Sequence, residues 1–314
     1  MLQTTGKRLI WLAPILLFTS FFSFSLMYLS PGDPARLILE AELQAPPTGE
    51  QLAQYEKKHG LDKSFLSQYG LWLARALHGD LGRSLKTGRE VFPVLLEKLG
   101  NTAKLFVIGM GVSIVIALPL GVLAAVKADS PMDHFLRFTS LGGISVPNFW
   151  WGILLVYLFS VKLQWLPAFG SLESKHFILP AATIGITGAM DLMRLTRTSV
   201  LEVLNRNYVR TARAKGLDET AVLLKHVLRN ALIPIITSIG LYFGHMVGGS
   251  ILIETLFAWP GIGRHLATAA SMRDLPVIQG IVFVSGIFFV LLNLLVDLTY
   301  SLLDPQIRIK EPGV

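Results

Sequence analysis

The sequence has no cysteine and few charged residues. The absence of cysteine from all 314 residues excludes a disulfide framework, a thiolate metal site and a thiol nucleophile. Only 16% of the residues are charged, whereas 52% are hydrophobic and the mean hydropathy is +0.55. Soluble domains average about 25% charged residues. The composition therefore predicts a membrane protein.

Three sequence motifs that are typical of enzymes are also missing. The sequence has no Gly-x-x-x-x-Gly-Lys-Ser/Thr phosphate loop, no His-Glu-x-x-His zinc motif and no Gly-x-Ser-x-Gly elbow. We therefore expect a chain that is not an enzyme and binds no cofactor itself. The formal net charge of +7 could favour nucleic acid, but the basic residues gather between apolar segments, so we expect no nucleic-acid partner.

Six apolar runs are candidates to cross a bilayer, which takes about 20 helical residues. They are residues 9–29, 105–126, 138–161, 177–193, 232–253 and 277–296. The first run could also be a signal peptide. A helix stop at Ser30-Pro31-Gly32 follows it instead of a small-x-small cleavage site, so we expect an uncleaved span. In the third run, the aromatic residues after Pro147 fit an interfacial belt, or a path lining if the helix breaks there. The predicted fold is all-α with six transmembrane helices.

The distribution of Lys and Arg predicts the orientation of the chain. The segment 194–230 is rich in them, whereas the short segment 162–176 has only Lys162 and Lys175. Because cytoplasmic loops carry the excess of positive charge, we expect segment 194–230 and both termini in the cytoplasm. The predicted parts are an N-terminus with the first span (1–29), an extracytoplasmic helical segment (30–100), a permease core (101–303) and a cytoplasmic tail (304–314). Within 30–100, residues 49–58 and 65–77 are amphipathic and are expected to be short helices.

The basic segment contains a pattern for two helices joined by a sharp turn. Strong helix formers precede Gly216, which tolerates the left-handed conformation that ends a helix. Asp218 can cap the next helix. We therefore expect a helix, a turn at Gly216, and a second helix over about residues 219–229.

This segment resembles the cytoplasmic coupling loop, the EAA loop, of the permease subunits of ABC importers. Residues 210–217 read Arg-Thr-Ala-Arg-Ala-Lys-Gly-Leu and residues 226–231 read His-Val-Leu-Arg-Asn-Ala, the form of the dipeptide, oligopeptide and nickel branch. Arg210 and Thr211 stand where Glu and Ala are commonest in importers at large. The resemblance implies an ATPase-coupling role for Arg210, Thr211, Ala212, Arg213, Ala214, Lys215, Gly216, Leu217, Asp218, His226, Arg229 and Asn230.

The resemblance implies a permease subunit in a bacterial cytoplasmic membrane that moves small peptides, or nickel in chelated form, into the cell. It further implies a heterodimer with a homologous permease, two ATP-binding subunits that hold ATP and Mg, and an extracytoplasmic solute-binding protein. The choice between peptide and nickel stays open at this point. An ion-coupled secondary transporter or a membrane scaffold is the alternative; a secondary transporter typically has repeated halves, which this sequence lacks.

Three further features fall within the spans. Gly240, Gly244 and Gly248 recur every four residues and predict one smooth stripe for helix packing and a permease interface. Asp191 is expected to form a local ion pair with Arg194 rather than to act in transport. His245 is expected to be a buried histidine and not a metal ligand, since no second ligand stands at a suitable spacing.

Overall fold

The computed structural model describes residues 2–29, 33–170, 173–244 and 246–303, so the predictions for His245 and for the tail 304–314 lie outside it. The chain forms two compact units. The first comprises residues 1–101 and 260–291, and the second comprises residues 102–259 and 292–314. Over the described residues the regular structure is helical, apart from one isolated β-bridge between Arg83 and Glu90.

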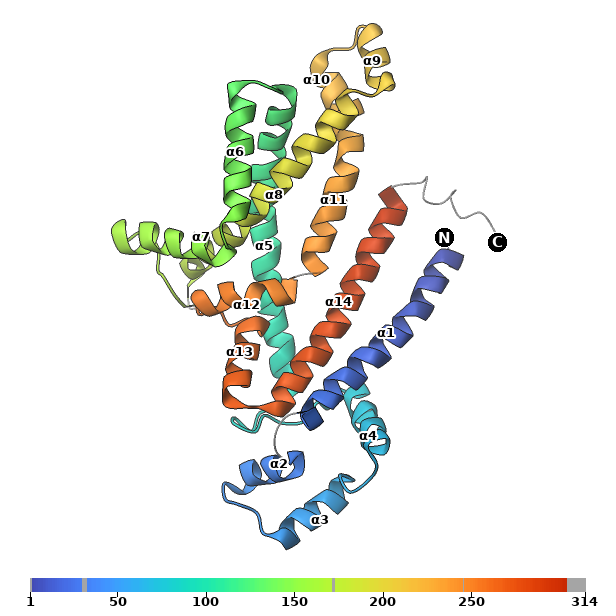
Figure 1. Ribbon diagram of the computed structural model, residues 1–314, viewed down its shortest axis with the longest axis vertical. Helices are drawn as coiled ribbons and strands as arrows, with labels where there is room; N and C mark the ends of the chain where they lie inside the picture. Colours follow the sequence, from blue (N-terminus) through green and yellow to red (C-terminus); the bar gives the residue numbers. More distant parts are fainter. Residues whose placement is uncertain (1, 30–32, 171–172, 245, 304–314) are drawn as a thin grey trace. The chain divides into compact units, whose positions relative to one another are not determined.

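Figure 1 follows the helices along the chain. The first unit contains α1 (Leu2–Leu29), α2 (Pro34–Leu43), α3 (Gly49–His59), α4 (Phe65–Leu77), the start of α5 (Val91–Val126), α13 (Ile262–Met272) and most of α14 (Leu275–Leu303). The second contains the rest of α5 and α14, α6 (Pro131–Ser145), α7 (Asn148–Leu155), the π-helix η1 (Val156–Lys162), the 3-10 helix η2 (Ser174–Phe177), α8 (Ile178–Leu204), α9 (Asn207–Ala214), α10 (Glu219–Ala221), the π-helix η3 (Val222–Leu228), α11 (Arg229–Gly244) and α12 (Met246–Leu256).

Five helical stretches are each long and apolar enough to cross a membrane alone. They are Leu12–Leu29, Val91–Val126, Ser174–Leu204, Glu219–Gly244 and Leu275–Val296. A sixth candidate is the pair Pro131–Ser145 and Asn148–Lys162, which is bent by 102°. The all-α membrane fold predicted from the sequence is confirmed, with one of its six spans present only as a bent pair.

The prediction of one straight third span over residues 138–161 is wrong. The helix stops at Ser145, and Val146 takes an extended conformation with φ −89° and ψ 129°. Pro147 accounts for the break because its ring disfavours the helical conformation in the preceding residue and it has no N–H to donate. Across the bend, Trp151 Nε1 donates a hydrogen bond to the Gly143 carbonyl at 3.2 Å. The alternative noted from the sequence, a break at Pro147, is the one that occurs.

The predicted fifth span, residues 232–253, does not continue as one straight helix (Figure 1). α11 ends at Gly244 and α12 starts at Met246, and Figure 1 shows α12 running across the direction of α11. A Cβ added to Gly240 would lie 2.6 Å from Val296, whereas one on Gly248 would meet open space. Gly240 and Gly248 therefore do not share one straight helix face, and the permease interface at Gly240, Gly244 and Gly248 stays a prediction.

The closest packing that glycine permits in the second unit lies between α5 and α8. A Cβ on Gly109 would lie 2.6 Å from Ile184, and one on Gly121 would lie 2.6 Å from Thr196. Ser113 Oγ donates a hydrogen bond to the Gly185 carbonyl at 2.9 Å. Small residues of this kind let two backbones approach where lipid removes the hydrophobic drive for association.

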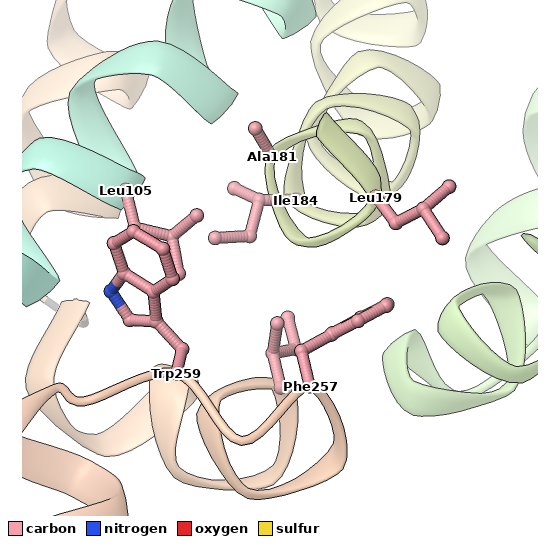
Figure 2. Packing of buried hydrophobic residues seen from close by; sticks show 7 residues of the cluster. Leu105, Leu179, Ala181, Ile184, Phe257 and Trp259 are labelled. Carbon is pink, nitrogen blue, oxygen red and sulfur yellow. The ribbon is translucent and has the colours of Figure 1, made fainter. Parts of the chain in front are cut away.

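A buried hydrophobic cluster joins α5, α8 and α12 (Figure 2). Its members are Leu105, Leu179, Ala181, Ile184, Ile253, Phe257 and Trp259. Beside it, Thr102 Oγ1 on α5 donates a hydrogen bond to Glu254 Oε1 on α12 at 2.5 Å, and both side chains are buried. The carboxylate therefore has a protein partner, as a buried charge requires.

In the first unit, α1 packs on α4 through aromatic rings. Phe24 contacts Phe65, Tyr69 and Trp72 at centroid distances of 5.3, 5.7 and 5.7 Å. The predicted helices at 49–58 and 65–77 are confirmed as α3 and α4, whereas α2 was not predicted.

A buried ion pair fastens α6 to α8. Arg197 Nε and Nη2 donate to the two carboxylate oxygens of Asp133 at 2.5 and 2.6 Å, and the Asp133 side chain is fully buried. Asp133 also accepts the Asp129 backbone N–H at 3.0 Å. This geometry holds the turn between α5 and α6 against α8.

We predict that removing one member of this pair destabilises the chain strongly. Asp133→Ala leaves Arg197 without its partner in a largely buried position, which costs about 3–5 kcal/mol in such pairs. Glu202→Ala is the matched control, since its pair with Arg206 is exposed and worth about 0–1 kcal/mol. Thermal unfolding in detergent measures both. Equal melting temperatures for the two variants would contradict the assignment.

Candidate coupling site

The segment from α9 to α10 forms the predicted helix, turn and helix. α9 ends at Ala214, and Gly216 has φ +78°, in the left-handed region that favours glycine. The Gly216 N–H donates to the Arg213 carbonyl at 2.9 Å. Asp218 Oδ2 then accepts the Thr220 N–H at 2.9 Å and caps α10. The turn at Gly216 and the cap at Asp218 are confirmed.

The second helix does not end near residue 229 as the sequence predicts. α10, η3 and α11 form one helical run over Glu219–Gly244. Apolar residues continue the helix after Arg229. The sequence changes there from polar to apolar residues, and this change marks no end of the helix. Residues 207–218, here called the coupling segment, are thus joined directly to a helix that is long and apolar enough to span the membrane.

A buried apolar cluster underlies the segment, here called the coupling cluster. It draws side chains from α5, α8, α9, η3 and α11: Ala125, Val200, Val209, Ala212, Val222, Val227 and Ala231. Val209, Val222 and Val227 are fully buried. Burial of apolar surface stabilises a fold by about 25 cal/mol per Å². Because an eight-residue helix is not stable alone in water, the burial of these side chains holds α9 in place.

Polar contacts fix the two sides of the turn to each other. Arg213 Nε and Nη2 donate to the Glu219 carboxylate at 2.7 and 3.2 Å. Asn230 Nδ2 donates to the Tyr208 hydroxyl at 3.0 Å and to the His226 carbonyl at 2.9 Å. α9 is thereby tied both to α10 and to the start of α11.

Most of the residues predicted to couple are exposed. Those with exposed positions are Arg210, Thr211, Arg213, Ala214, Lys215, Gly216, Leu217, Asp218, Arg229 and Asn230, while His226 is half-buried. Ala212 differs, because it is 5% exposed and belongs to the coupling cluster. Its methyl group therefore packs inside this chain. One turn of helix separates Ala212 from Val209, which puts both on the buried face.

Sequence reasoning missed Tyr208, Glu219 and Leu224. Tyr208 and Glu219 hold the turn through the hydrogen bonds to Asn230 and Arg213. Leu224 is 58% exposed and Leu217 is 43% exposed, so apolar side chains accompany the basic ones on this surface. The exposed part of residues 207–218 can accept a protein partner through both charge and apolar contact. Among the described residues, no group of three or more His, Cys, Asp or Glu side chains could hold a metal ion.

The described residues thus form a helical membrane protein in which a helix, a sharp turn and a second helix lie next to the candidate spans. Residues 117–309 match the family described as "Binding-protein-dependent transport system inner membrane component", and residues 1–106 match the corresponding N-terminal family. The chain belongs to this family of ABC importer permeases.

Relatives agree with this assignment, and two solved structures share the fold. The chain is 40% identical to the glutathione transport system permease protein GsiC of Escherichia coli (strain K12), over 99% of this chain and 100% of that one. It is 38% identical to the dipeptide transport system permease protein DppB of Alkalihalophilus pseudofirmus, over 98% and 100%. An inward-facing structure of the MetNI methionine ABC transporter shares the fold at 16% identity and TM-score 0.57, over 67% of this chain and 96% of that one. The crystal structure of an amino acid ABC transporter also shares the fold, at 13% identity and TM-score 0.53. The match covers 67% of this chain and 94% of that one.

The burial pattern of α9 yields a prediction about its two alanines. Ala212→Leu forces three extra carbons into the coupling cluster and should destabilise the chain by about 1–3 kcal/mol. Ala214→Leu places the same atoms on an exposed position and should change stability by less than about 0.5 kcal/mol. Thermal unfolding of the two purified variants measures the difference. A larger loss for Ala214→Leu would show that α9 is rotated relative to this description.

Proposed function

We propose that this permease carries small peptides inward and that residues 207–218 receive the movement of ATP-hydrolysing subunits. The coupling cluster carries the proposal. It joins the exposed segment to α5, α8 and α11, so a displacement of α9 by a partner moves three membrane-spanning helices together. Close-packed clusters transmit strain rather than absorb it.

The surface chemistry of the segment supports a protein partner. Leu217 at the turn is an apolar side chain 43% exposed to solvent, and Arg210, Lys215 and Arg229 are exposed around it. Interface centres are enriched in apolar and arginine side chains. We assign this surface to two cytoplasmic ATP-binding subunits, which hold ATP and Mg, while this chain binds neither.

Small peptides are the proposed cargo. Two relatives that match the chain over nearly its whole length are named for glutathione and dipeptide transport, and both cargoes are peptides. This favours peptides over nickel. The proposed complex pairs this chain with a homologous permease. It receives cargo from an extracytoplasmic solute-binding protein, which the description of the family as binding-protein-dependent supports. Both termini face the cytoplasm in this arrangement.

We predict that Gly216→Val uncouples transport from ATP hydrolysis. A Cβ at Gly216 meets no atom within 4 Å, so the change acts on the backbone alone. Holding a β-branched residue at φ +78° costs about 1–2 kcal/mol, so the turn should reshape. The complex should assemble in lipid, yet a peptide-loaded binding protein should no longer stimulate its ATP hydrolysis, and uptake should fall.

Gly216→Asn is the matched control, since asparagine tolerates the left-handed region. It should keep both stimulation and uptake. Full stimulation and normal uptake in Gly216→Val would refute the coupling role. A wild-type complex that hydrolyses ATP but ignores every peptide would instead refute the cargo.

The proposed orientation is open to a direct test because the chain has no cysteine of its own. In intact cells, a membrane-impermeant thiol reagent should label Gln54→Cys and Ser271→Cys. It should not label Ala128→Cys or Thr220→Cys, all four positions being exposed. Labelling of Thr220→Cys from outside would invert the orientation and remove the coupling segment from the cytoplasm.

A further inference from the structure

A stripe of polar residues runs along one face of α8. Thr187, Asp191, Arg194 and Thr198 are spaced by four, three and four residues, which places them on one side of a helix. None of the four is buried. The opposite face is buried and includes Ala189, Leu192, Met193, Thr196, Ser199 and Val200. α8 therefore has one buried face and one polar face, although it is long enough to span the membrane.

The charged pair of the stripe lies in the middle of α8, which continues past residue 193, where the sequence predicted the span to end. Asp191 is 13 residues from Ile178 and 13 from Leu204, the two ends of α8. At 1.5 Å per residue, about 20 Å of helix lies on either side. Asp191 lies within the predicted span 177–193, and a charge that faces hydrocarbon is unfavourable, so such residues face a water-filled cavity or another protein. The exposed face of α5 is different, because Val107, Ile108 and Val115 make it suited to lipid.

Asp191 and Arg194 present opposite charges side by side. Arg194 Nη2 lies 3.1 Å from Asp191 Oδ1, and the Tyr242 hydroxyl of α11 donates a hydrogen bond to Asp191 Oδ2. The pair expected from the sequence is confirmed, with Tyr242 as an additional partner. The Asp191 side chain is 40% exposed and that of Arg194 is 58% exposed. Exposed pairs of this kind contribute little to stability, so they exchange readily for other ions.

The chemistry of the pair matches the proposed cargo. A small peptide carries an ammonium group at one end and a carboxylate at the other, and the pair offers a carboxylate and a guanidinium to them. A guanidinium binds a carboxylate through two parallel hydrogen bonds. Tyr242 would keep the Asp191 carboxylate oriented when Arg194 turns to the peptide.

We propose that the polar stripe of α8 lines the translocation path and that Asp191 and Arg194 bind the charged ends of a peptide within the membrane. This inference rests on the proposed function, since it assumes a peptide cargo. It assigns to the permease itself a cargo contact separate from the solute-binding protein.

Cysteine accessibility tests the lining. In the reconstituted complex, a water-soluble thiol reagent should modify Thr187→Cys, and a peptide-loaded binding protein with ATP should slow the reaction. Val115→Cys is the matched control, since Val115 is 73% exposed in this chain but lies on the apolar face of α5. It should not react. A Thr187→Cys side chain that stays unreactive in every nucleotide state would overturn the proposal.

Charge substitution tests the contact. Asp191→Asn should lower uptake of an unblocked dipeptide about tenfold, the effect of losing one charge-assisted hydrogen bond. Binding-protein-stimulated ATP hydrolysis should stay within about twofold of wild type, because the coupling segment is untouched. Asp191→Glu should restore most of the uptake. Glu202→Gln removes a charge from the same helix outside the predicted span 177–193 and should leave both activities unchanged.

Unchanged uptake in Asp191→Asn would refute the contact. A parallel loss of uptake and stimulation, unrelieved by Asp191→Glu, would assign Asp191 a structural role and refute it as well. If Asp191→Asn fails to assemble, the reaction of Thr187→Cys with the thiol reagent tests the proposal, and an unreactive Thr187→Cys would refute it. Failure of the proposed function gives a different result, since wild-type hydrolysis would then be insensitive to peptide.

Discussion

The close approach of α5 and α8 is the constraint on which the second unit depends. Lipid is as apolar as the helix surfaces, so the hydrophobic effect supplies little force to hold spans together. Gly109 and Gly121 on α5 accept Ile184 and Thr196 of α8, and the Ser113 hydroxyl bonds to the α8 backbone. Leucine at either glycine would separate the backbones. The Asp133–Arg197 pair and the cluster in Figure 2 continue this packing to α6 and α12.

The coupling segment is built on the ends of the same helices. Val209 and Ala212 belong to the same buried cluster as Ala125 of α5, Val200 of α8 and Ala231 of α11. Because the run from Glu219 to Gly244 is helical throughout, no loop separates the Gly216 turn from the membrane-spanning part of this helix.

Local chemistry was predictable from the sequence, and long-range packing was not. Gly216 and Asp218 signal a turn and a cap through their own conformational preferences, and both were predicted correctly. Pro147 signals a possible break, but not that it bends the third span by 102°. The glycine spacing of Gly240 and Gly248 suggested a packing stripe, yet spacing alone cannot show which glycines have a neighbour. Tyr242 reaches Asp191 from 51 residues away, a contact that no local pattern records.

The central claim is that the exposed Gly216 turn touches an ATP-hydrolysing subunit. Site-specific cross-linking measures this most directly, because a cysteine placed in this chain is its only one. Leu217→Cys, fitted with a short photoactivated cross-linker in the assembled complex, should join this chain to an ATP-binding subunit. Phe138→Cys, 76% exposed on α6, should not. Cross-linking from Phe138→Cys but not from Leu217→Cys would contradict the account.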